Sequence, residues 1–127
     1  MAVDPEFLDH LRDLFAGLGP IRTGRMFSGA GLYVEDDVMF AMISSAGILF
    51  MKSDATTEHA FLEAGSTPFS YERGGRTQAI HSLMSLPESA LDDPDEALHW
   101  ARLSLPPARI ATAAKRQQKV RKKARKT

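Results

Sequence analysis

The chain has 127 residues, with 16 basic and 16 acidic side chains, a formal net charge of zero and no cysteine. This length predicts one domain with a real hydrophobic core, and 43% hydrophobic residues are typical of a folded soluble protein. The missing thiols exclude a disulfide scaffold, a cysteine nucleophile and a thiolate zinc site. With no signal peptide and no membrane-spanning apolar run, we expect a cytoplasmic protein that does not contact a membrane.

The charge is divided between two unlike parts of the chain. Residues 1–114 hold 8 basic and 16 acidic side chains, whereas residues 115–127 hold eight basic ones and no acid. The chain is therefore an acidic body followed by a basic tail. The eight tail cations are Lys115, Arg116, Lys119, Arg121, Lys122, Lys123, Arg125 and Lys126.

The first predicted element is an amphipathic helix that begins at the Asp4–Pro5 pair and ends at Gly17–Pro20. Four short apolar segments separated by tight turns follow, and they predict antiparallel strands. Their ranges are residues 21–27, 31–34, 38–43 and 48–51.

The second half of the chain continues with a short helix capped by Asp54. Two strands, residues 68–73 and 77–86, then flank a Gly74–Gly75 hairpin turn. A last helix starts at Asp93–Pro94, and we expect Pro106–Pro107 to end it. Beyond these prolines we expect a frayed helix or disorder.

This order predicts an α+β fold, α-β4-α-β2-α, with a mostly antiparallel sheet of five to six strands and helices packed on one face. The predicted organisation is a domain over residues 1–105 and a basic, flexible tail over residues 106–127.

Catalytic and metal motifs are weak throughout the chain. His59 with Glu63, and Asp95 with His99, are each four residues apart on predicted helices, and a two-ligand pair is more often an exposed ion pair than a metal site. We therefore predict no catalytic residues, no metal and no cofactor. One alternative stays open, a ligand-binding or enzymatic pocket near Arg25, Lys52 and His81.

The basic tail predicts attraction to phosphates through counterion release. It contains no aromatic residue, so any nucleic-acid contact should be non-specific. The alternative is a solubilising terminus that folds back on the acidic body.

Several segments in order carry a family resemblance. Residues 25–33, Arg-Met-Phe-Ser-Gly-Ala-Gly-Leu-Tyr, are followed by Leu-Phe-Met-Lys at 49–52 and by Leu-Pro-Glu at 86–88. Together they resemble the N-terminal domain of the TfoX/Sxy family, without the second domain of its competence regulators. The motif residues that we expect to form turns or a surface are Arg25, Met26, Phe27, Gly29, Gly31, Tyr33 and Lys52.

The resemblance implies a non-enzymatic interaction module linked to competence for DNA transformation and to transcription regulation. It also implies a protein partner that the sequence does not identify. A structural homodimer is a further alternative.

Overall fold

The computed structural model describes residues 4–26 and 29–126. The N-terminal half contains α1 (Pro5–Leu14), a 3₁₀ turn at Ala16–Leu18, and the strands β1 (Arg22–Met26), β2 (Gly29–Val34), β3 (Val38–Ile43) and β4 (Leu49–Lys52). The C-terminal half contains α2 (Glu58–Glu63), β5 (Pro68–Arg73), β6 (Arg76–Ser85), a 3₁₀ turn at Glu88–Asp92 and α3 (Pro94–Lys126).

The strands form one antiparallel sheet in the order β1-β2-β3-β4-β6-β5. This arrangement confirms the predicted α+β fold, and two 3₁₀ turns are added to the predicted order of helices and strands. The predicted turn between β5 and β6 is also confirmed, because Gly74 and Gly75 have φ angles of 61° and 78°, as a tight hairpin requires.

The core lies between the sheet and the helices α1 and α3. A register shift between β2 and β3 at Leu32/Tyr33 lets two successive residues of β3, Phe40 and Ala41, both be fully buried. Phe40 meets Phe15, which follows α1, with an edge-to-face contact at 5.3 Å between ring centroids. This contact fixes the end of α1 on the sheet.

The predicted end of the last helix at Pro106–Pro107 is wrong, because α3 continues through both prolines. Each proline removes one hydrogen bond of the helix. Packing offsets that loss, since Ser104 and Ala108 on either side of the prolines have no exposed surface and α3 lies against β3 and β4. None of the helices that the structure describes is long and apolar enough to cross a membrane.

The predicted disorder after the prolines is wrong as well, because the backbone stays helical to Lys126. The flexibility of this segment stays a prediction. Residues 108–126 contain no glycine or proline and consist mostly of Ala, Lys, Arg and Gln, which are good helix formers. With the preceding turns held on the sheet, the costly nucleation step is already complete. The domain boundary that we placed at residue 105 therefore falls inside one continuous helix.

We predict that Ile43→Ala lowers the free energy of unfolding by about 2–5 kcal/mol, because it leaves a cavity in the hydrophobic core. Ile43 is 1% exposed, whereas Ile48, five residues later, is 49% exposed. Ile48→Ala is the matched control and should change stability by about 0.5 kcal/mol or less. Chemical denaturation followed by circular dichroism measures both, and equal losses would contradict this core.

Candidate nucleic-acid interface

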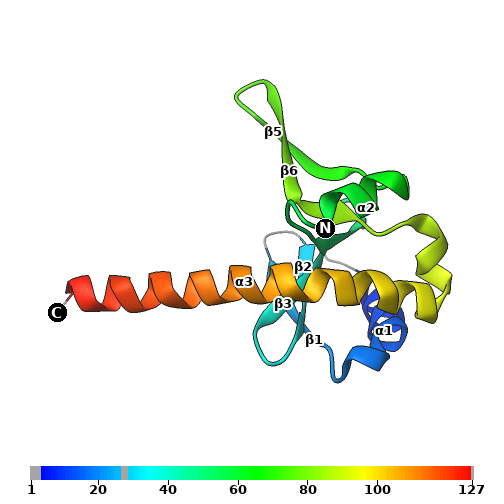
Figure 1. Ribbon diagram of the computed structural model, residues 1–127, viewed down its shortest axis with the longest axis horizontal. Helices are drawn as coiled ribbons and strands as arrows, with labels where there is room; N and C mark the ends of the chain where they lie inside the picture. Colours follow the sequence, from blue (N-terminus) through cyan, green and yellow to red (C-terminus); the bar gives the residue numbers. More distant parts are fainter. Residues whose placement is uncertain (1–3, 27–28, 127) are drawn as a thin grey trace.

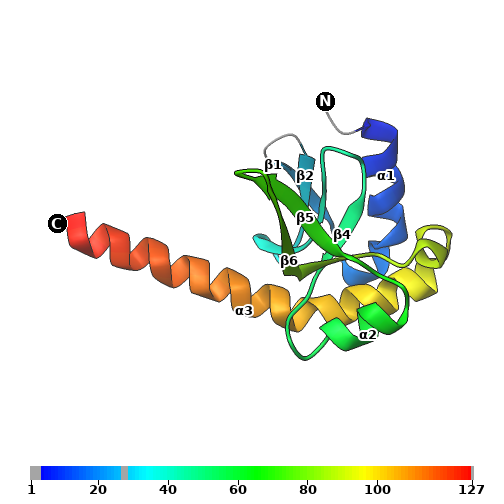
Figure 2. The same ribbon diagram turned by 90° about the horizontal axis from the view of Figure 1, so that it is seen from above.

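The last turns of α3 project beyond the sheet and away from the other elements (Figures 1 and 2). We call residues 115–126 the arm. The backbone of the arm is helical throughout, and its side chains are described as far as Lys123. The side chains of Arg125 and Lys126 lie outside that description.

One face of α3 changes its chemistry along its length. Over the sheet this face carries a contact stripe of small buried residues, Ala97, Ala101, Ser104, Ala108 and Thr112. The same steps of three and four residues continue in the arm to Lys115, Lys119 and Lys122. The face that lies on the sheet thus becomes cationic where the sheet ends.

The arm's cations are concentrated on that face. At 3.6 residues per turn, five basic positions of the arm fall within an arc of about 120° around the helix axis, and Arg121 lies outside this arc. We call this group the basic face; its members are Lys115, Arg116, Lys119, Lys122 and Lys123. A disordered tail would show no such sidedness.

Two arginines connect α3 to the turn between β2 and β3. Arg109 donates from Nε to Oε1 of Glu35 at 3.0 Å and from Nη2 to Oε2. Arg116 donates from Nε to Oδ2 of Asp37 at 2.9 Å and from Nη2 to Oδ1. Both pairs are two-pronged, a geometry that fixes direction as well as distance. They hold the root of the arm against the body.

The backbone of the turn that carries these carboxylates has an unusual conformation. Glu35 and Asp36 have φ angles of 52° and 72°, in the left-handed region that residues other than glycine seldom adopt. Hydrogen bonds from Arg116 lower the pKa of Asp37 below its ordinary value of 3.8, and the charge of Lys119 lowers it further. Hydrogen bonds from Arg109 likewise lower the pKa of Glu35. Both groups are therefore ionised at neutral pH.

Lys52 lies at the end of β4, a strand on which α3 packs. It is half-buried, and no salt bridge to it is found within residues 4–26 and 29–126. Burial lowers the pKa of Lys52, and the neighbouring charge of Lys115 lowers it further. The charge of Lys115 thus acts on Lys52 at the root of the arm.

The motif residues near the N-terminus lie on β1 and β2. Gly24 and Gly31 leave room for the ring of Tyr33, and the guanidinium of Arg22 stands 4.3 Å from the centre of that ring. Arg25 is exposed on β1. Phe27 lies outside the described residues, as does the side chain of Met26.

The structure does not bring Arg25, Lys52 and His81 together. Arg25 is three strands from Lys52 in the sheet, about 14 Å at the usual strand spacing, and the two are also offset along the strands. His81 instead contacts α2, where its Nδ1 lies 2.5 Å from Oε1 of Glu58. The arrangement of these three residues therefore gives no support to a shared pocket.

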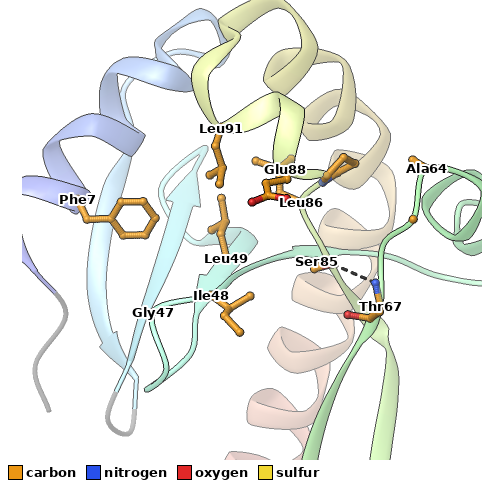
Figure 3. A pocket seen from close by; sticks show the side chains of 12 residues that line it. Phe7, Gly47, Ile48, Leu49, Ala64, Thr67, Ser85, Leu86, Glu88 and Leu91 are labelled. Atoms are coloured by element: carbon orange, nitrogen blue, oxygen red, sulfur yellow. Dashed lines mark hydrogen bonds between the residues drawn. The ribbon is translucent and has the colours of Figure 1, made fainter.

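An open groove of about 470 Å³ lies elsewhere, between α1, the β3–β4 turn and the segment after β6 (Figure 3). Its lining combines apolar side chains, among them Phe7, Ile48 and Leu91, with an almost equal share of polar surface. Among the described residues that line it, Glu88 is the one with an ionisable side chain. A single carboxylate without a partner offers no acid–base pair.

The sequence contains two helix pairs, His59 with Glu63 and Asp95 with His99, which we expect to be exposed ion pairs rather than metal sites. His59 forms an exposed pair with Glu63 at 2.8 Å. The described part of the chain contains no group of three or more His, Asp or Glu side chains placed to hold a metal ion. A two-residue pair on the surface is an ordinary helix contact.

Sequence analysis missed the partners of the arm. The sequence predicts residues 35–37 as a turn and indicates no role for Arg109. In the structure, Glu35 pairs with Arg109 and Asp37 pairs with Arg116, and both pairs orient α3. A signal was present, because Arg109 and Arg116 are seven residues apart and so lie on one side of a helix. Nothing in the sequence pointed that side at the β2–β3 turn.

We predict that the carboxyl of Asp37 titrates below its ordinary pKa and that Arg116→Gln raises this pKa toward the ordinary value. Because the pKa is lower in the folded chain, the pairing is fully present above the unfolded value and is lost as the pH falls through the folded value. Carboxyl NMR titration measures this. Lys122→Gln is the control, and a normal pKa for Asp37 in the unmodified chain would contradict the clamp.

We predict unequal effects of adding a methyl group at the two motif glycines. A Cβ on Gly29 would lie 1.9 Å from the carbonyl oxygen of Ile43, a backbone atom, whereas one on Gly31 would meet the movable side chains of Tyr33 and Met39. Gly29→Ala should cost about 1–3 kcal/mol or more in unfolding free energy, and Gly31→Ala clearly less. Thermal melts compare the two, and the reverse order would contradict the β2–β3 pairing.

Comparison with protein families gives one match, to the family described as TfoX N-terminal domain, over residues 13–108. No curated protein matches the chain. The matched segment spans the six strands and ends in α3 just beyond the two prolines, before the arm. The chain therefore belongs to the TfoX N-terminal domain family.

Proposed function

We propose that this chain is a non-enzymatic regulatory module of the TfoX type whose arm contacts nucleic acid without sequence preference. Membership of the family supports the regulatory role, with its link to competence and transcription. The arm supplies a feature that the matched segment lacks. The proposal thus assigns protein contacts to the folded body and phosphate contacts to the arm.

The observation that carries the nucleic-acid contact is the placement of the cations. Eight basic residues lie within residues 115–127, and the helix carries them past the sheet of an otherwise acidic body. Projection matters because acidic side chains repel phosphates, and this repulsion is screened only over about 8–10 Å in physiological salt. The arm extends about 18 Å, so it takes most of its charge beyond that range.

The composition of the arm supports backbone contact rather than base recognition. Residues 113–127 contain no aromatic side chain to stack on bases. Binding that depends on lysine and arginine alone neutralises phosphates and releases counterions. It is therefore strongly dependent on salt and nearly independent of sequence.

The half-exposed outer face of the sheet, opposite α1 and α3, supports a protein contact. Tyr33, Met39 and Met42 are neither buried nor fully exposed, and the Tyr33 ring lies next to Gly31. Aromatic and methionine side chains are common at protein interfaces. This face is the part of the body that we assign to a protein partner.

We predict that replacing all eight arm cations by glutamine in the full-length chain abolishes duplex binding. For the unmodified chain, the logarithm of the affinity should fall with the logarithm of salt concentration at a slope of about −4 to −6, from five or six phosphate contacts. Fluorescence anisotropy with a labelled 20-base-pair duplex measures this, with circular dichroism as the check on folding. If the glutamine variant kept the affinity and slope of the unmodified chain, the proposed nucleic-acid contact would be refuted.

A further inference from the structure

The basic face of the arm is turned toward the body rather than away from it. Lys115, Lys119 and Lys122 continue the contact stripe by which α3 lies on the sheet. Arg116, on the same face, bonds to Asp37 of the β2–β3 turn. Lys119 is near enough to Asp37 to lower its pKa. The cations thus line the inner corner between arm and body.

This corner lies beside an acidic turn, yet the turn is largely neutralised. Glu35 and Asp37 are paired with Arg109 and Arg116, which leaves Asp36 as the unpaired acid of residues 35–37. Lys115, Lys119, Lys122 and Lys123 form no salt bridge in the part of the chain that the structure describes. These four positive charges outnumber the single unpaired acid of the turn, Asp36, so the corner attracts anions.

Lys52 adds a fifth cation at the root of the arm. It stands at the end of β4 beside α3, half-buried and close to the charge of Lys115, with no acidic partner among the described residues. Two like charges brought together in a partly dehydrated place repel one another, and an anion between them removes that repulsion. This pair marks where the cationic surface begins.

We propose that the phosphate backbone of a nucleic-acid duplex lies in this inner corner, from Lys52 at the root of the arm along the basic face to Lys123. The inference rests on the proposed function and adds to it a defined helix face and a residue of the body. The spacing favours a duplex, because cations one helical turn apart form a straight row about 5–6 Å from one to the next, suited to a regular line of phosphates.

Other anionic partners fit the arm less well. An amphipathic helix that binds a membrane needs a broad apolar face opposite its cations, and in residues 113–123 Val120 is the one large apolar residue. Acidic protein surfaces do not present charges in a regular line. Both partners are kept as outcomes of the experiment.

The decisive variant moves charge around the helix without changing composition. The fourfold change Ala114→Lys, Gln117→Lys, Lys119→Gln and Lys122→Ala transfers two cations from the inner face to the outer face. The full-length chain keeps its net charge and amino-acid content. A second variant, Lys119→Arg with Lys122→Arg, keeps both cations on the inner face as the matched control.

We expect the rearranged variant to bind a 20-base-pair duplex about tenfold more weakly at 50 mM salt, with a salt slope less steep by about two units, one for each lost phosphate contact. The arginine control should bind like the unmodified chain. Equal binding by the rearranged variant would overturn the inner corner while the proposed contact still held, because the eight-glutamine variant tests that contact separately. Equal affinity for polyglutamate or for anionic vesicles would overturn the choice of a duplex.

The contribution of Lys52 to duplex binding is tested by comparison with another basic residue of the body, Arg25. Lys52→Gln should reduce the slope by about one unit, whereas Arg25→Gln, which removes the same charge from the distant strand β1, should leave it unchanged. Lys52→Arg should restore the slope, and thermal melts verify that each variant is folded. Equal effects of Lys52→Gln and Arg25→Gln would remove Lys52 from the surface.

Discussion

The close approach of α3 to the sheet is the contact on which the other features of this protein depend. The contact stripe consists of alanines, Ser104 and Thr112, which are small enough to let the helix axis lie near β3. The hydroxyl of Ser104 donates to the carbonyl of Trp100 within the same turn, so this buried polar group is satisfied. Packing of this kind keeps the helix continuous through Pro106 and Pro107 and gives the arm a fixed starting direction.

The helical conformation of the last segment also limits the attraction between its cations and the acidic body. An acidic body and a basic segment in one chain attract one another, and a flexible basic tail could collapse onto the acids it follows. Here only two carboxylates of the nearest turn, Glu35 and Asp37, are paired with α3, by Arg109 and Arg116. The helical backbone carries the remaining cations past the sheet, apart from most of the body's acids. Exposed pairs of this type contribute little to stability, so their value here is geometric.

Much of the fold could be predicted from the sequence because its signals are local. Asp4 and Asp93 cap helices, as their side chains accept from Glu6 N and Asp95 N, and Gly74–Gly75 forms the expected hairpin. For the candidate site, the sequence predicted which basic residues are present but not how they are arranged. The arm's cations were evident, but their common face appears only once residues 115–126 are known to be helical. The pairs Arg109–Glu35 and Arg116–Asp37 join residues more than seventy positions apart, and no local pattern encodes such a contact.

The amino-acid sequence by itself determined the element order, the family resemblance and the separation of charge into a body and a basic segment, because capping, periodicity and composition act over a few residues. Only the tertiary structure decided that the last helix passes through its prolines and that its basic face turns inward. Both outcomes depend on the energy of packing small side chains against a sheet formed by distant strands. The low helix propensity of proline opposes the first outcome, and local helix propensity does not determine the direction in which the basic face turns.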